Sequence, residues 1–221
     1  MAEDASRPSR LKFYLYLLAL RHPRLASLLA NRGQNFLTVP DADLGSLDRW
    51  RRLEGLDEMA HYAVIAGYLV RLAPGGSILD VGCGQGLLAQ YIAPFVGRYL
   101  GIDRDEPCIK AAKESGVENA VFEVADAHSY APASAFDAIV FNESLWYLRD
   151  PLNILRRYAD CLTPNGVVVV SLAAFRPALQ LIHMTRSVCE FVDQTIVMND
   201  LGVVWAVQAL RRKRPAAQKK T

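Results

Sequence analysis

Glycines and aspartates stand at regular distances in the middle of the chain. The segment Asp80–Gly86, DVGCGQG, places glycines at alternate positions directly after an apolar run that ends in an acid. Asp103 and Asp126 follow at successive intervals of 23 residues. Glycines without side chains let a backbone approach a ligand closely, and a turn before a helix exposes amide groups. An acid at the position of Asp103 accepts hydrogen bonds from both hydroxyls of a ribose, so the pattern indicates a nucleotide-like ligand.

Strands and helices must alternate to bring these residues together. The expected strands are short apolar runs rich in β-branched residues, at Ser77–Val81, Arg98–Asp103, Ala120–Val124, Phe136–Phe141, Gly166–Leu172, Gln194–Met198 and Val203–Leu210. The helices expected between them are Gly86–Ala93, Glu106–Glu114, Pro151–Cys161 and Ala178–Phe191. This alternation predicts a mostly parallel sheet with helices on both faces.

The end of the sheet differs from the rest. Only Asn199–Gly202 separates the last two expected strands, which is short enough for a hairpin, so those two strands should run antiparallel. In such sheets ligands bind beyond the carboxyl ends of the strands, where Asp80, Asp103 and Asp126 stand.

A dinucleotide-binding fold is the main rival interpretation. Its fingerprint is G-x-G-x-x-G, whereas this loop reads G-x-G-x-G between Gly82 and Gly86. Asp103 as a helix cap and Asp126 as a turn residue are structural alternatives that stay open. Asp80 either binds an ammonium group of the ligand or only organises the loop.

The series of motifs resembles the class I S-adenosylmethionine (SAM)-dependent methyltransferases, from about Asp57 to Leu210. The resemblance implies an α/β, Rossmann-like three-layer sandwich. Its seven-stranded, mostly parallel sheet would have the order 3-2-1-4-5-7-6, with strand 7 antiparallel. Small-molecule methyltransferases of the ubiquinone-biosynthesis-like kind look most similar. The reaction implied is direct in-line transfer of the methyl group of SAM to a metabolite, sugar or lipid-linked acceptor, which releases S-adenosylhomocysteine (SAH).

The resemblance also implies a cofactor site. The glycines would line the methionine and ribose end, Asp103 would bind the ribose, Asp126 with the Ala127 amide would face the adenine, and Asn142 would lie near the acceptor entrance. The full implied set is Asp80, Gly82, Cys83, Gly84, Gly86, Asp103, Arg104, Asp126, Ala127 and Asn142.

A general base is not identified by the sequence. A hydroxyl acceptor benefits from a base near the operating pH, whereas an amine needs only its neutral form. Related proteins often carry a histidine after the fourth strand, where this chain has Tyr147 in ESLWYLRDP. The candidates are His61, Glu143, Tyr147 and His183, and each has a structural alternative.

Net charge and cysteine spacing limit the classes of ligand and the compartment that we expect. The net charge of +2 rests on six basic residues in 211–221, and the body without them carries a net charge of −4. This balance argues against an extended nucleic-acid-binding face. The four cysteines show no C-x-x-C spacing, so no metal site is expected, and together with the absence of a signal-peptide layout they favour a cytoplasmic protein.

Three regions are expected. Residues 1–72 should form a helical cover or lid, with one helix from Leu11 to Ala30 interrupted at Pro23 and a longer one over Leu47–Leu72. Residues 73–210 should form the SAM-binding domain, and 211–221 a disordered basic tail. The apolar run Leu11–Leu20 is too short to span a membrane, although it has the character of a surface helix. An RNA or protein methyltransferase and a non-catalytic SAM-binding protein remain alternatives.

Overall fold

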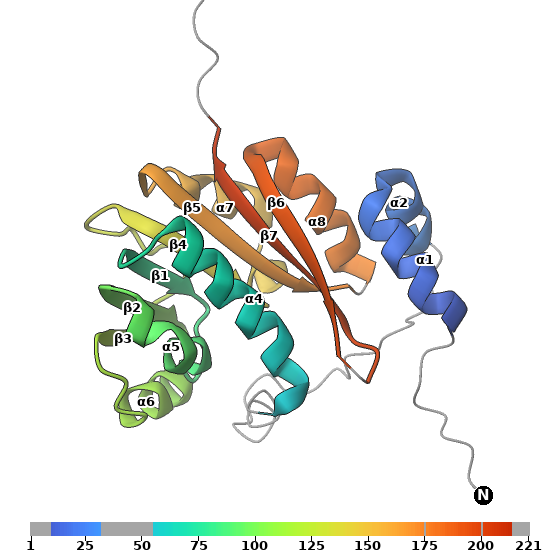
Figure 1. Cartoon of the computed structure of the whole chain (residues 1–221). Helices are drawn as coiled ribbons and strands as arrows, with labels where there is room; N and C mark the ends of the chain where they lie inside the picture. Colours follow the sequence, from blue (N-terminus) through green and yellow to red (C-terminus); the bar gives the residue numbers. More distant parts are fainter. Residues whose placement is uncertain (1–9, 32–54, 175, 200, 214–221) are drawn as a thin grey trace, which may run out of the picture.

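A single seven-stranded sheet forms the centre of the protein (Figure 1). The computed structural model describes residues 10–31, 55–174, 176–199 and 201–213. The strands are β1 (Ser77–Val81), β2 (Arg98–Asp103), β3 (Ala120–Val124), β4 (Phe136–Asn142), β5 (Leu162–Ala173), β6 (Cys189–Met198) and β7 (Val204–Arg212). Their order is β3-β2-β1-β4-β5-β7-β6. Only β7 runs antiparallel to its neighbours, which confirms the predicted topology.

Helices cover both faces of the sheet. They are α1 (Arg10–Arg21), α2 (Pro23–Asn31), α4 (Leu56–Leu72), α5 (Leu87–Ile92), α6 (Glu106–Glu114), α7 (Pro151–Ala159) and α8 (Arg176–Val188). None of these helices is long and apolar enough to cross a membrane.

Alternating residues of the strands divide the core into two halves. Ile78, Val140 and Val169 pack with α4, α5 and α6 on one face. Leu79 and Phe141, on the adjoining strand positions, pack with α1, α2, α7 and α8 on the other. Because side chains alternate along a strand, Asp80 and Asn142 must lie on the α4 face, at the carboxyl ends of β1 and β4.

The N-terminal helices lie on opposite sides of the sheet. Figure 1 shows α4 crossing one face, with α1 and α2 beside α8. His183 joins α8 to α1, because its Nε2 lies 2.7 Å from the Ala19 carbonyl oxygen. The predicted break at Pro23 is present. Residues 47–54 of the predicted second helix lie outside the described residues.

Two strands, β5 and β6, are longer than predicted by several residues. β5 begins at Leu162, where the sequence predicted a turn through residue 166, and its pairing with β4 shifts register between Phe136 and Ala138. β6 begins at Cys189 rather than Gln194, because its first residues pair with Arg211 and Arg212 at the end of β7. These two arginines therefore belong to the sheet, although the sequence placed them in the tail. Residues 214–221 are outside the described part.

Candidate functional site

The glycine loop follows β1 in a backbone conformation that favours glycine. Gly82, Gly84 and Gly86 all have positive φ, at 78°, 53° and 73°. A Cβ on Gly82 would lie 2.5 Å from the Cβ of Ser144, and one on Gly86 would lie 2.7 Å from the Phe122 ring. A Cβ on Gly84 would meet no heavy atom within 4 Å. Gly82 and Gly86 are thus required by packing, while Gly84 leaves open space beside the loop.

The amides of this loop are not free. The N–H groups of Gly82 and Cys83 both donate to the Ile102 carbonyl, at 2.8 and 3.0 Å, and Gly86 donates to Cys83 at 3.0 Å. Gly84 donates to the Asp103 carboxylate at 2.9 Å. For these four residues the expectation of exposed amides is wrong, because the neighbouring strand and acid already accept their hydrogen bonds. The loop instead offers a bare backbone surface to a ligand.

Asp103 ends β2 and is held from two sides. One carboxylate oxygen accepts the Gly84 N–H and the other accepts the Asp105 N–H, each at 2.9 Å. A carboxylate has about four acceptor positions, so each oxygen retains one for a ribose hydroxyl. The side chain is partly exposed. Asp103 therefore both closes the glycine loop and presents acceptors beside it.

The segment after β3 forms a second wall. Asp126 accepts the backbone N–H of His128 at 2.8 Å and pairs with its ring Nδ1 at 2.8 Å. The hydrogen bond from the His128 amide lowers the pKa of Asp126, so this acid is ionised at neutral pH. His128 Nε2 accepts the Arg149 N–H at 3.1 Å, which places the ring proton of neutral His128 on Nδ1.

Two residues of α7 fix the position of Ala127. Arg157 and the Tyr158 hydroxyl both donate to its carbonyl oxygen, the latter at 3.1 Å, and Arg157 also donates to the His128 carbonyl at 2.6 Å. The backbone that the resemblance places against adenine is therefore rigidly supported. The sequence alone did not identify these two residues as supports, because nothing marks a contact between α7 and the loop after β3.

Asp80 is buried, with an exposed fraction of 1%. The hydroxyl of Tyr99 donates to its Oδ2, while its Oδ1 is buried without a hydrogen-bond partner in the described part of the chain. Burial raises the pKa of Asp80 to about 7, the Tyr99 hydrogen bond lowers it, and the charge of Asp103 adds to the rise. A buried polar atom without a partner is costly, so Oδ1 marks a position where a ligand donor would be stabilised.

The end of β4 carries the residues nearest the expected acceptor. Glu143 has φ +54° and accepts hydrogen bonds from the Ser171 hydroxyl at 3.2 Å and the Ala173 N–H at 3.0 Å. Burial raises its pKa to about 8, although these two hydrogen bonds lower it. Ser144 donates to the Val81 carbonyl and so holds the end of β4 against the end of β1.

His61 on α4 lies over the same region. Its ring stacks on Trp205 with centroids 4.9 Å apart, and neither ring nitrogen has a hydrogen-bond partner in the described residues. The Glu58 carboxylate lies 3.7 Å from Nδ1. Burial lowers the pKa of His61 to about 4, and Asn142 partly offsets this effect. His61 is therefore neutral at pH 7, and the side-chain oxygen of Asn142 is likewise buried without a hydrogen-bond partner among the described residues.

The remaining predicted residues lie further out. Arg104 is exposed after β2 and contributes to the lowered pKa of Asp126. Tyr147, 40% exposed, packs against Trp146 with ring centroids 3.6 Å apart. His183 faces α1 through Ala19, on the face of the sheet opposite His61.

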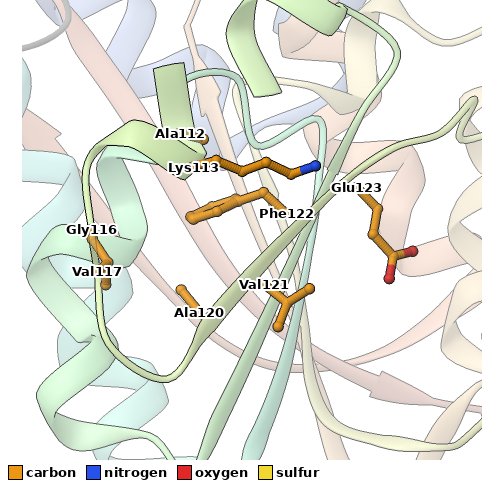
Figure 2. A pocket seen from close by; sticks show the side chains of 8 residues that line it. All are labelled: Ala112, Lys113, Gly116, Val117, Ala120, Val121, Phe122 and Glu123. Carbon is orange, nitrogen blue, oxygen red and sulfur yellow. The ribbon is translucent and has the colours of Figure 1, made fainter. Parts of the chain in front are cut away.

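A separate hollow lies between α6 and β3 (Figure 2). Figure 2 shows the Phe122 ring between Lys113 and Val121, with Val117 to the left and Glu123 to the right. The hollow contains none of the residues assigned to the cofactor. Its connection to the site is indirect, through the Phe122 ring that packs beside Gly86.

The strand order and the loop after β1 together define the class I methyltransferase fold. A solved structure of the N-methyltransferase NodS from Bradyrhizobium japonicum, in complex with SAH, superposes with a TM-score of 0.65 at 18% identity, over 77% of this chain and 95% of that one. The structure of the [4+2]-cyclase SpnF covers 92% of this chain and 95% of its own with a TM-score of 0.59 and 19% identity. At these identities the likeness shows the fold.

Sequence comparison gives the family. The methyltransferase-domain family model matches residues 59–188, more than half of the chain, and the protein belongs to this family. A ubiquinone biosynthesis O-methyltransferase of Xanthomonas campestris pv. campestris is 35% identical over 111 residues, which are 48% of this chain and 46% of the relative. The match thus spans about half the length of that relative.

Proposed function

We propose that the protein transfers a methyl group from SAM to a small-molecule acceptor. The observation that carries this proposal is the arrangement at the carboxyl ends of β1 and β2. There a loop with glycine at alternate positions, the partly exposed Asp103 carboxylate and the buried, unpartnered Oδ1 of Asp80 stand at the ends of two neighbouring strands. The family match and the O-methyltransferase relative support the same activity.

The residues present fit SAM. Asp103 would accept the ribose hydroxyls, the Asp126–Ala127 segment would border the adenine, and Asp80 would face the ammonium group of the methionine part. When bound, SAM supplies a sulfonium-activated methyl group. The protein then has to hold an acceptor in line with that methyl group and exclude water, and oriented proximity of this kind contributes roughly 7–11 kcal/mol.

The acceptor side is assigned to His61, Asn142 and Glu143. His61 is neutral at pH 7 because burial lowers its pKa to about 4, so it can accept a hydrogen bond and is a weak base. Glu143, whose pKa burial raises to about 8, is the better matched base, since its carboxylate is strongly basic once ionised. Glu143 therefore replaces the histidines as the preferred candidate for proton removal.

Turnover by the purified protein tests the proposal. The protein is incubated with methyl-labelled SAM and fractions of a cell extract, and label is followed in small-molecule, RNA and protein fractions. Label in a small-molecule product supports the proposal. Label only in RNA or protein would give the macromolecular alternative. Bound SAM without transfer to any fraction would leave a SAM-binding protein with another role, and the [4+2]-cyclase SpnF has a similar fold.

The Glu143→Gln variant distinguishes hydroxyl from amine acceptors. With a hydroxyl acceptor we expect kcat to fall about 10²- to 10⁴-fold, because general base catalysis contributes this much. The kcat of the wild type should rise with pH and level off above about pH 8, where Glu143 is ionised, and the variant should lose this limb. SAH affinity should stay the same in both proteins.

His183→Asn is the control for changing a polar side chain away from the proposed acceptor site. It removes the hydrogen bond to Ala19 on the opposite face and should leave the pH profile of kcat unchanged. An unchanged profile in Glu143→Gln would show that Glu143 is not the base.

A further inference from the structure

The Asp80 carboxylate is oriented by a residue of the next strand. In the parallel register Ile78 pairs with Tyr99 and Asp80 pairs with Gly101, so the Tyr99 side chain lies diagonally to Asp80 on the α4 face of the sheet. Gly101 has no side chain, and a Cβ there would lie 2.8 Å from the Cys83 sulfur. Tyr99 is fully buried, and its hydroxyl donates to Oδ2 of Asp80. This leaves Oδ1 as the oxygen available to another donor.

The surroundings of Asp80 contain no compensating cation in the described part of the chain. The ion pairs in the described part of the chain do not include Asp80. They join His61 with Glu58, Lys110 with Glu114 and His128 with Asp126. The titratable groups facing Asp80 are Tyr99 and Asp103 on β2, Tyr62 on α4 and Cys83 in the glycine loop.

These neighbours add no positive charge. Burial raises the pKa values of the Tyr62 and Tyr99 phenols and of the Cys83 thiol, so all three stay neutral at pH 7. Asp103, if ionised, contributes a negative charge. The site around Oδ1 is therefore built for a cation that the described residues do not supply.

We propose that Tyr99 is a positioning residue for the cofactor, and that Asp80 releases a proton when the cofactor's ammonium group binds at its Oδ1. The proposal rests on the proposed function, because that function supplies the ammonium group. Tyr99 fixes the carboxylate through Oδ2, and the cation replaces the missing partner at Oδ1. The proton on Asp80 in the unliganded protein passes to the buffer, and no other bond changes.

A dependence of binding on pH follows. Burial raises the pKa of Asp80 to about 7, so below that pH the unliganded site is mostly protonated and must lose a proton before it pairs with the cation. The dissociation constant of SAH should therefore rise by about tenfold for each pH unit below 7 and level off above 7, until the ammonium group of SAH itself loses its proton. 5′-Methylthioadenosine, which keeps the adenosine part but has no ammonium group, should bind with no such dependence.

The experiment is calorimetric titration of the full chain with SAH between about pH 5.5 and pH 9. At about pH 6, comparison of buffers with different ionisation enthalpies gives the number of protons released, which we expect to approach one. In Tyr99→Phe the carboxylate loses a hydrogen bond that favours its charged form. The midpoint of the pH dependence should therefore move upward by about one unit, with affinity largely restored at about pH 8.5.

Two variants complete the test. Asp80→Asn should bind SAH at least tenfold more weakly at pH 8 and show no pH dependence, because it cannot ionise. Tyr68→Phe removes a phenol that contacts Asp193 and Thr195 across α4 and β6, and it should reproduce the wild-type midpoint.

Distinct outcomes overturn the inference and the proposed function. SAH binding that is tight and independent of pH, with no proton released, would refute the proton linkage and leave the methyltransferase proposal standing. Weaker binding by Tyr99→Phe at every pH, with an unchanged midpoint, would reduce Tyr99 to a packing residue. Absence of SAH binding by folded wild-type protein at any pH would refute the proposed function itself.

Discussion

Replacing Asp103 by alanine should weaken SAH binding by at least 100-fold. Hydrogen bonds to a charged group contribute about 1.5–3 kcal/mol each, and Asp103 is expected to accept two from the ribose hydroxyls. The same carboxylate accepts the Gly84 N–H at 2.9 Å, so its loss also releases the loop that borders the ligand. Calorimetric titration with SAH measures the effect directly.

Asp105→Ala is the matched control for this variant. Asp105 stands two residues further on, before α6, and donates its backbone N–H to Asp103, a contact that the substitution keeps. It removes the same charge from the same loop, so affinity should change by no more than a few-fold. Equal losses in both variants would show that general electrostatics or loop stability, rather than ribose recognition, explains the role of Asp103.

Replacing Gly82 by alanine should destabilise the fold more than the same change at Gly84. The residue has φ +78°, and an added Cβ would lie 2.5 Å from the Cβ of Ser144. The left-handed conformation costs about 1–2 kcal/mol for a residue with a side chain, and overpacking adds about 1–3 kcal/mol. With about 2–4 °C per kcal/mol at this chain length, the Tm should fall by roughly 5–20 °C. Thermal unfolding monitored by circular dichroism measures it.

Gly84→Ala should show the opposite balance of effects. Its φ is +53°, but an added Cβ would meet no heavy atom within 4 Å. Only the backbone cost of about 1–2 kcal/mol applies, so the Tm should fall less than in Gly82→Ala. The methyl group would occupy the space beside the loop, and SAH binding should weaken although the protein stays folded. A larger loss of Tm in Gly84→Ala than in Gly82→Ala would contradict this reading of the loop.

The sequence predicted the architecture because its signals were local. Apolar β-branched runs define β1 to β4 to within a residue, and the short link at Asn199–Gly202 indicates the antiparallel end of the sheet. The longer strands β5 and β6 were less predictable, since residues 162–166 read as a turn and residues 189–191 as the end of a helix. In both strands pairing with a neighbour overrides the local pattern.

The candidate site was predictable only in part, for a related reason. Asp80, Asp103 and Asp126 were found from their spacing, because equal strand–helix units place them at equal distances. The residues that support this arrangement were not found from the sequence. Tyr99 contacts Asp80 through strand register, and Arg157 holds the backbone next to Asp126 through helix packing, and neither contact has a local sequence signature. Register makes the Tyr99 contact intelligible afterwards, since Asp80 pairs with Gly101 and Tyr99 stands two residues before Gly101 on the same face of β2.

Titration of the wild-type protein with SAH and, separately, with NAD tests the central claim most directly. We predict saturable one-to-one binding of SAH and none of NAD at the same concentrations, because the loop between Gly82 and Gly86 lacks the spacing of the dinucleotide fingerprint. Binding of NAD by a folded protein that ignores SAH would contradict the account and make the glycine loop a dinucleotide site.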